Sequence, residues 1–133
     1  MFQASAKILI VDDSAIYREV VKLQLTELGY SQFIEADDGL TALNVLIDDK
    51  QGPIELVICD WHMKQMSGMQ LLLKVRALEQ FKKLPFLLVT TEGQMERVLD
   101  AIIAGVSDYI VKPVTKEMLQ KKMAVAYSKA GKM

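Results

Sequence analysis

The residues Ile8-Leu-Ile-Val-Asp12-Asp13-Ser14 place four apolar side chains directly before two carboxylates and a hydroxyl. Such a short apolar run is typical of a strand in a parallel sheet that is covered on both faces. Ser14 is a good N-cap for a helix that reaches about Leu28 and stops at Gly29. This segment therefore predicts a strand whose carboxyl end passes into a helix.

The same alternation of strand and helix recurs along the rest of the chain. Short apolar runs predict strands at residues 7–11, 32–36, 54–59, 85–90 and 107–111. Helical periodicity or capping residues predict helices at residues 14–28, 39–49, 69–79 and 92–104, and a fifth helix after residue 115. The run at 32–36 is the most polar, which favours a place near an edge. The order predicts an α/β fold with a parallel sheet, right-handed crossovers and helices on both faces.

Length and composition limit what the chain can be. It has 133 residues, of which 51% are hydrophobic, a net charge of −1 and an isoelectric point of about 5.8. We expect a single domain over residues 1–133 with its core at about 7–129, and no nucleic-acid or membrane-surface binding. The single cysteine, Cys59, and the absence of a signal peptide or a membrane-length apolar run favour the cytoplasm.

Polar residues follow the predicted strands where each one ends. Asp12 and Asp13 follow the first strand, Asp60 follows the third, Thr90 ends the fourth and Lys112 follows the fifth. Ligands of open parallel sheets bind outside the carboxyl ends of the strands, so we expect these side chains to converge there.

This set of residues suits one kind of chemistry. Clustered carboxylates raise each other's pKa unless a cation neutralises them, and oxygen ligands of this kind suit Mg²⁺. A lysine supplies a positive charge for a phosphoryl oxygen, and a carboxylate can carry a covalent phosphoryl group. Each residue alone has a simpler explanation as a turn former or a strand residue. Their joint occurrence at four strand ends predicts phosphoryl transfer to an aspartate.

Four segments resemble the response-regulator receiver family. They are residues 8–14, Val57-Ile-Cys-Asp60-Trp-His-Met63, Leu88-Val-Thr90 and Tyr109-Ile-Val-Lys112-Pro113. The resemblance is closest to stand-alone CheY-like chemotaxis regulators. It implies a flavodoxin-like (βα)5 fold, with a doubly wound five-stranded parallel sheet in the order 2-1-3-4-5.

The resemblance also implies a role for each matching residue. Asp60 matches the phosphoacceptor. Asp12, Asp13, Asp60 and the backbone carbonyl of His62 match the ligands of a Mg²⁺ ion.

Further residues match the groups that respond to the phosphoryl group. Thr90 matches the hydroxyl that moves onto it, Lys112 matches the amine that binds it, and Tyr109 matches the aromatic switch. His62 and Glu92 match positions that tune the lifetime of the phosphoryl group. The resemblance implies a cis peptide bond between Lys112 and Pro113, the type of bond at which cis is least costly.

The expected function is therefore that of a two-component receiver. A histidine kinase supplies the phosphoryl group, a phosphatase is a further expected partner, and the chain catalyses only its own phosphorylation and dephosphorylation. The signal would leave through the face of the fourth helix, fifth strand and fifth helix, toward a protein such as a flagellar switch component.

Three alternatives stay open. The chain could be a receiver cut from a longer regulator, or an interaction module without phosphorylation. It could also be an aspartyl-nucleophile phosphohydrolase, although such enzymes carry a second Asp where this chain has His62.

Overall fold

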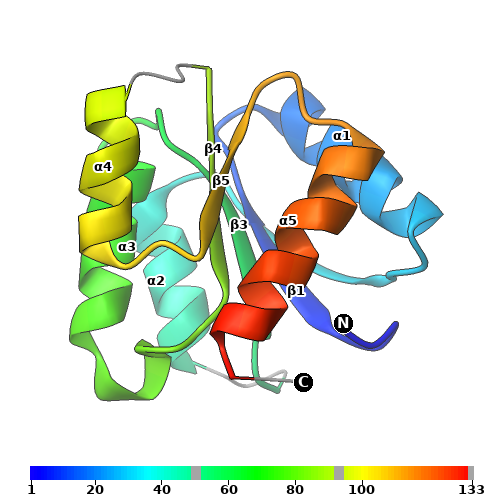
Figure 1. The fold of residues 1–133 in the computed structure, drawn as a ribbon, viewed down its shortest axis with the longest axis horizontal. Coiled ribbons are helices and arrows are strands. Elements are labelled where there is room, and N and C mark those ends of the chain that lie inside the picture. Colours follow the sequence, from blue (N-terminus) through cyan, green and yellow to red (C-terminus); the bar gives the residue numbers. More distant parts are fainter. Residues whose placement is uncertain (49–51, 92–94, 132–133) are drawn as a thin grey trace.

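The computed structural model describes residues 1–48, 52–91 and 95–131, and within these ranges five strands alternate with five α-helices. In chain order the elements are β1 (Lys7–Val11), α1 (Ala15–Glu27), β2 (Gln32–Ala36), α2 (Gly39–Asp48), β3 (Leu56–Asp60), α3 (Gly68–Ala77), a 3₁₀ turn (Glu79–Phe81), β4 (Phe86–Thr90), α4 (Met95–Ala104), β5 (Asp108–Val111) and α5 (Lys116–Lys129). All strand pairs are parallel, in the order β2-β1-β3-β4-β5 (Figure 1). The predicted fold class and strand order are confirmed.

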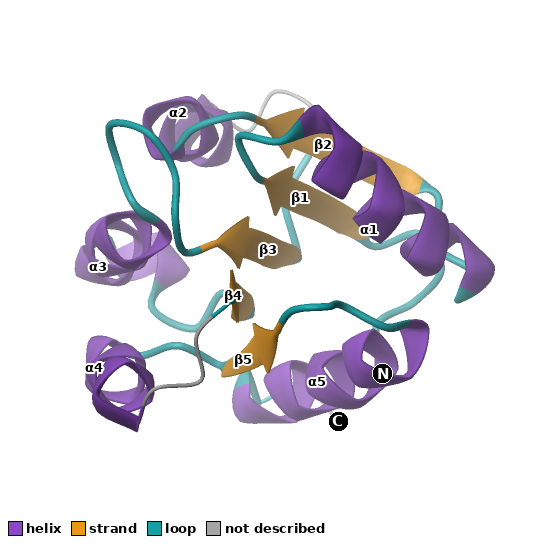
Figure 2. Ribbon diagram, turned by 90° about the horizontal axis from the view of Figure 1, so that it is seen from above, coloured by secondary structure: helices purple, strands orange, loops and turns teal. Residues whose placement is uncertain are grey.

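Helices cover both faces of the sheet. Seen from above in Figure 2, α1 and α5 lie on one side of the sheet, and α2, α3 and α4 lie on the other. Since side chains of a strand point alternately to opposite faces, each strand supplies both layers. β1 therefore buries Ile8 and Ile10 under α1 and α5, and Leu9 and Val11 under the other three helices.

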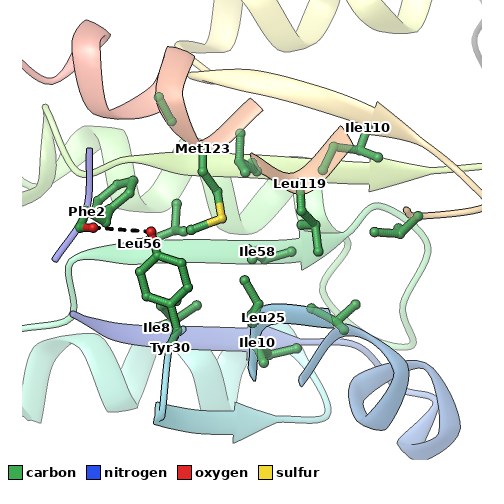
Figure 3. Close-up of a cluster of buried hydrophobic side chains, with 14 of the residues drawn as sticks. Phe2, Ile8, Ile10, Leu25, Tyr30, Leu56, Ile58, Ile110, Leu119 and Met123 are labelled. Atoms are coloured by element: carbon green, nitrogen blue, oxygen red, sulfur yellow. Dashed lines mark hydrogen bonds between the residues drawn. The ribbon is translucent and has the colours of Figure 1, made fainter. Parts of the chain in front are cut away.

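The layer beneath α1 and α5 is the core cluster drawn in Figure 3. Leu25 of α1 and Leu119 of α5 are fully buried there against strand residues such as Ile58. At the end of the sheet away from the carboxyl ends, the Tyr30 hydroxyl donates a hydrogen bond of 3.2 Å to the Phe2 carbonyl. This packing holds the strands in fixed register and so fixes the positions of their ends.

The predicted helix boundaries are confirmed where the capping signals were clear. The Ser14 side chain accepts a hydrogen bond from the Tyr17 amide at the start of α1. Gly29 and Gly105, just after α1 and α4, have φ values of 103° and 94°, which favour glycine. The predicted start of the fourth helix, at 92, falls at residues outside the described ranges.

Three expectations about burial and length were wrong. The spacing of Leu43, Leu46 and Ile47 predicts a buried apolar stripe on the second helix, but Ile47 is 54% exposed, and the buried residues of α2 are Gly39, Ala42 and Leu46. The third helix ends at Ala77 and a 3₁₀ turn follows it. The apolar run at residues 107–111 predicts a fully buried strand, but only Ile110 of β5 is buried, because β5 is an edge strand with no described strand on its outer side.

Among the described residues, no helix is both long enough and apolar enough to span a membrane.

Candidate functional site

Three carboxylates meet at the carboxyl edge of the sheet. One carboxylate oxygen from each of Asp12, Asp13 and Asp60 lies within 4.8 Å of the others. The register explains this convergence, because Val11 pairs with Cys59, so neighbouring strands β1 and β3 end at the same level. Asp12 and Asp60 are each only 7% exposed, whereas Asp13 is open to solvent.

The turn from β1 into α1 is fixed by its own hydrogen bonds. The Ser14 amide donates to Oδ1 of Asp12 at 2.9 Å, which orients this carboxylate. Arg18 donates from one guanidinium nitrogen to the Asp12 carbonyl at 2.6 Å and from Nε to Glu35 at 3.0 Å. The start of α1 is thereby tied to the ends of both β1 and β2.

Lys112 follows the edge strand β5, and its side chain reaches the acid cluster across the carboxyl ends of the strands. Its Nζ lies 3.3 Å from Oδ1 of Asp60 and 3.9 Å from Oδ2 of Asp12, and its side chain is 11% exposed. Its amide donates to the Thr90 carbonyl at 2.8 Å, and its bond to Pro113 is cis, as predicted. The ammonium is therefore held among the carboxylates.

The electrostatics of the site favour a further cation. Burial raises the pKa of Asp60 above its ordinary value, although the nearby Lys112 opposes the shift. Burial, with the charge of Asp60, likewise raises the pKa of Asp12. One amine thus leaves the buried carboxylates short of positive charge, and their hard oxygen atoms are the donors that Mg²⁺ prefers. The three aspartates could hold such an ion.

Thr90 and Tyr109 lie on the last two strands, β4 and β5. Thr90 ends β4, is 1% exposed and pairs with Val111 of β5. Tyr109 is half-buried, and Nζ of Lys122 lies 5.1 Å from the centre of its ring. Thr90 therefore lies at the carboxyl end of β4, whereas Tyr109 lies on the neighbouring strand two residues before its end, paired with Leu88. Their roles stay predictions.

The loop after Asp60 forms one wall of an open groove. The groove has a volume of about 490 Å³ and is lined by Asp13, residues 61–64 and Arg97, among others. The His62 side chain is exposed, with its Nε2 atom 3.2 Å from a terminal nitrogen of Arg97. Glu92, the other predicted tuning residue, lies outside the described residues.

Two side chains of the site were missed in the sequence. Tyr17 places its ring 3.8 Å from Nζ of Lys112, and Arg97 places its guanidinium 5.9 Å from the centre of the Trp61 ring. The position of Tyr17 in the first turn of a helix that begins at the site was a usable signal. Nothing in the sequence pattern pointed to Arg97.

Comparisons with known proteins agree with this geometry. Residues 8–124 match the response regulator receiver domain family. The chain is 47% identical over 117 residues to the chemotaxis protein CheY-3 of Vibrio cholerae, which covers 88% of each chain. It is 42% identical over 119 residues to the chemotaxis protein CheY1 of Helicobacter pylori, covering 90% of this chain and 94% of that one.

Solved structures show the same fold. The chemotaxis response regulator CheY4 of Vibrio cholerae superimposes with a TM-score of 0.79 at 32% identity, covering 92% of this chain and 98% of that one. A response regulator receiver domain protein from Clostridium thermocellum superimposes with a TM-score of 0.83 at 25% identity, covering 95% and 97% of the two chains. The sheet and all five helices therefore belong to a known architecture.

Proposed function

The chain belongs to the response regulator receiver family, and on that premise we propose that it accepts a phosphoryl group from a histidine kinase on Asp60. The observation that carries the proposal is the position of Asp60. It ends the central strand β3, beside Asp12 and Asp13, with the Lys112 amine 3.3 Å away. A nucleophile, an acidic cation site and a phosphoryl-binding amine are thus together.

The proposed step is an in-line displacement at phosphorus. A carboxylate oxygen of Asp60 forms the new bond, while the P–N bond of a phosphohistidine breaks and its imidazole leaves with the electron pair. Lys112 is placed to bind an oxygen of the transferred group. A Mg²⁺ ion held by Asp12, Asp13, Asp60 and the His62 carbonyl would offset the charge that gathers on the phosphoryl oxygens. The chain acts only on itself and turns over no separate substrate.

The proposed response involves Thr90 and Tyr109. The Thr90 hydroxyl moves onto the phosphoryl group, and Tyr109 turns inward into the space that Thr90 leaves. Support comes from the pairing of β4 with β5: Thr90 ends β4, and Tyr109 lies two residues before the end of β5, paired with Leu88. Phosphorylation then shifts the chain between two states that differ in their outer surface. His62 and Glu92 tune how long the phosphoryl group lasts.

The proposed output surface is formed by α4, β5 and α5. Each of these elements exposes apolar side chains: Ile103 of α4 is 84% exposed, Val111 of β5 is 42% and Met118 of α5 is 39%. Exposed apolar side chains on a surface favour protein binding when they form one patch. By analogy with the chemotaxis proteins that it resembles, the chain would act in the cytoplasm on a target such as a flagellar switch component, with a phosphatase as a further partner.

The direct test is phosphorylation from acetyl phosphate in the presence of Mg²⁺. Wild-type protein should gain the mass of one phosphoryl group, and Asp60→Asn should gain none. Asp48→Asn, an exposed residue at the end of α2, serves as the matched control and should label like wild type. Equal labelling of Asp60→Asn and wild type contradicts the assignment of the phosphoacceptor.

The partner can be tested with a phosphoryl mimic. Beryllofluoride-treated protein should capture its target more strongly than untreated protein, and Ile103→Asp should abolish the gain, since a charge would then stand in the apolar surface. If the amount of captured target changes neither with beryllofluoride nor with Ile103→Asp, this face is excluded as the output surface.

A further inference from the structure

The ammonium group of Lys112 lies on the face of an aromatic ring. Its Nζ is 3.8 Å from the centre of the Tyr17 ring, 3.3 Å from Oδ1 of Asp60 and 3.9 Å from Oδ2 of Asp12. A cation within about 6 Å of a ring centre is attracted to the negative face of the ring. Lys112 therefore has carboxylates on one side and an aromatic face on another.

Tyr17 is itself held in place. Its amide donates to the Ser14 side chain, and the next residue, Arg18, is bonded to the Asp12 carbonyl and to Glu35. The first turn of α1 is thus anchored to the same strand end that carries the acid cluster. The ring also lines a small cavity beside Asp60 and Asp12, so it closes the site on the side of α1.

We infer that Tyr17 is a positioning residue, which keeps the Lys112 ammonium directed at the phosphoacceptor. The inference rests on the proposed function and adds to it a residue outside the predicted set. Lysine has a flexible stem of four carbons, and its ammonium binds phosphoryl oxygen as a point charge. Without an aromatic face behind it, the ammonium could swing toward solvent or settle on Asp12 alone.

The ring acts only through its face. It makes and breaks no bond in the proposed transfer. Its contribution should therefore depend on the electron density of the ring and on its size, and little on the hydroxyl group. This dependence separates positioning by the ring from ordinary packing, which would follow size alone.

A series of substitutions at position 17 tests this directly. Tyr17→Leu should slow Asp60 phosphorylation by acetyl phosphate about 5- to 30-fold, the size of a desolvated cation–π contact expressed as a rate. Tyr17→Phe should stay within about 2-fold of wild type, because the face of the ring is kept. Replacing that Phe by its difluoro and trifluoro analogues should lower the rate in steps at nearly constant size.

The fluorinated series decides the question even if Tyr17→Leu fails to fold. An unchanged rate across it overturns the inference, and so does a Tyr17→Phe variant that loses as much as Tyr17→Leu. Tyr127→Leu is the matched control, since Tyr127 packs on Phe2 with ring centres 4.9 Å apart, remote from the acid cluster. It should lower stability and leave the rate of phosphorylation within about 2-fold.

A spectroscopic measurement reports the contact itself. In protein labelled with ¹³C-lysine, the protons next to Nζ of Lys112 should be shifted upfield by the Tyr17 ring. The shift should persist in Tyr17→Phe and vanish in Tyr17→Leu. If wild-type protein takes up no phosphoryl group, the proposed function fails along with the inference. If wild-type protein is phosphorylated and Tyr17→Leu is phosphorylated at the same rate, only the inference about Tyr17 is overturned.

Discussion

Nζ of Lys112 lies 3.3 Å from Oδ1 of Asp60, although the two residues follow strands that are not neighbours in the sheet. Lys112 follows the edge strand β5, and Asp60 ends the central strand β3, with β4 between them. The lysine stem therefore extends across the end of β4, where Thr90 is buried. The Lys112 side chain thus forms a direct link between the end of β5, which is part of the proposed output surface, and the acid cluster.

Replacing Lys112 should remove this link, and arginine should not restore it. A planar guanidinium is wider than an ammonium and does not fit a position enclosed by Tyr17 and two carboxylates. Both Lys112→Arg and Lys112→Met should slow phosphorylation by acetyl phosphate about 100-fold, the typical cost of losing one donor to transition-state charge. Lys82→Arg, in an exposed ion pair with Glu79, is the control and should react normally. Normal rates in Lys112→Arg would contradict the assigned role.

The buried carboxylates should make stability depend on pH. Burial raises the pKa of Asp60 above its ordinary value of 3.8, so the folded state binds a proton more tightly than the unfolded chain does. This carboxyl group therefore favours folding below pH 3.8, and that contribution is lost as the pH rises through the raised pKa. Asp60→Asn should accordingly be more stable than wild type at pH 7, with the difference shrinking toward pH 3.8.

Urea denaturation in the presence of a chelator measures this difference at each pH. Asp38→Asn is a control of opposite sign, because the Thr41 amide bonded to Asp38 at 2.7 Å lowers the pKa of that carboxyl. Asp38→Asn should be less stable than wild type at neutral pH, and the two should converge in acid. If Asp60→Asn is instead the less stable protein at pH 7, the ion pair with Lys112 outweighs the cost of burial.

Removing one acid should weaken binding of Mg²⁺. Asp13→Asn should lower the affinity about 10- to 100-fold, as changes around metal ligands commonly do. Calorimetry measures the affinity, and fluorescence offers a second readout, because the only tryptophan, Trp61, directly follows Asp60. Asp48→Asn, exposed at the end of α2, should bind like wild type. Equal affinities of Asp13→Asn and wild type would exclude Asp13 as a ligand.

Much of the site could be predicted because the topology determines it. Once the alternation of strands and helices indicates a parallel sheet, the residues after each strand must meet at one edge. That reasoning brought Asp12, Asp13, Asp60, Thr90 and Lys112 together, and the structure confirms that the three carboxylates and the amine lie close to one another. Their roles in phosphoryl transfer stay predictions.

The remaining features depend on details that strand order does not determine. The contact of Tyr17 with Lys112 requires a particular direction of two side chains, and that of Arg97 with Trp61 requires the placement of α4 against a loop. The misplaced Ile47 shows a related limit. Adjacent apolar residues on a helix lie about 100° apart, so Leu46 is buried while Ile47 points away.

Gly68 should be essential for the position of Asp60. Its amide donates to the Trp61 carbonyl at 2.9 Å, and a Cβ atom at this position would overlap the Asp60 carbonyl oxygen and lie 2.9 Å from Cδ2 of Leu88. Backbone atoms of a central strand cannot move aside as a flexible side chain can. Gly68→Ala should therefore lower the free energy of unfolding by about 1–3 kcal/mol, a usual cost of overpacking, and slow phosphorylation as well.

Ser67→Ala separates the effect on stability from the effect on the site. Ser67 and Gln70 form a capping box at the start of α3, so its loss should cost about 1 kcal/mol. Because Ser67→Ala leaves the contact between Gly68 and Asp60 unchanged, its rate of phosphorylation should match wild type. Urea denaturation measures the stability of both variants, and acetyl phosphate labelling measures their rates of phosphorylation. A Gly68→Ala protein that reacts at the wild-type rate would mean that α3 shifts to make room for the added methyl group and that the end of β3 keeps its position.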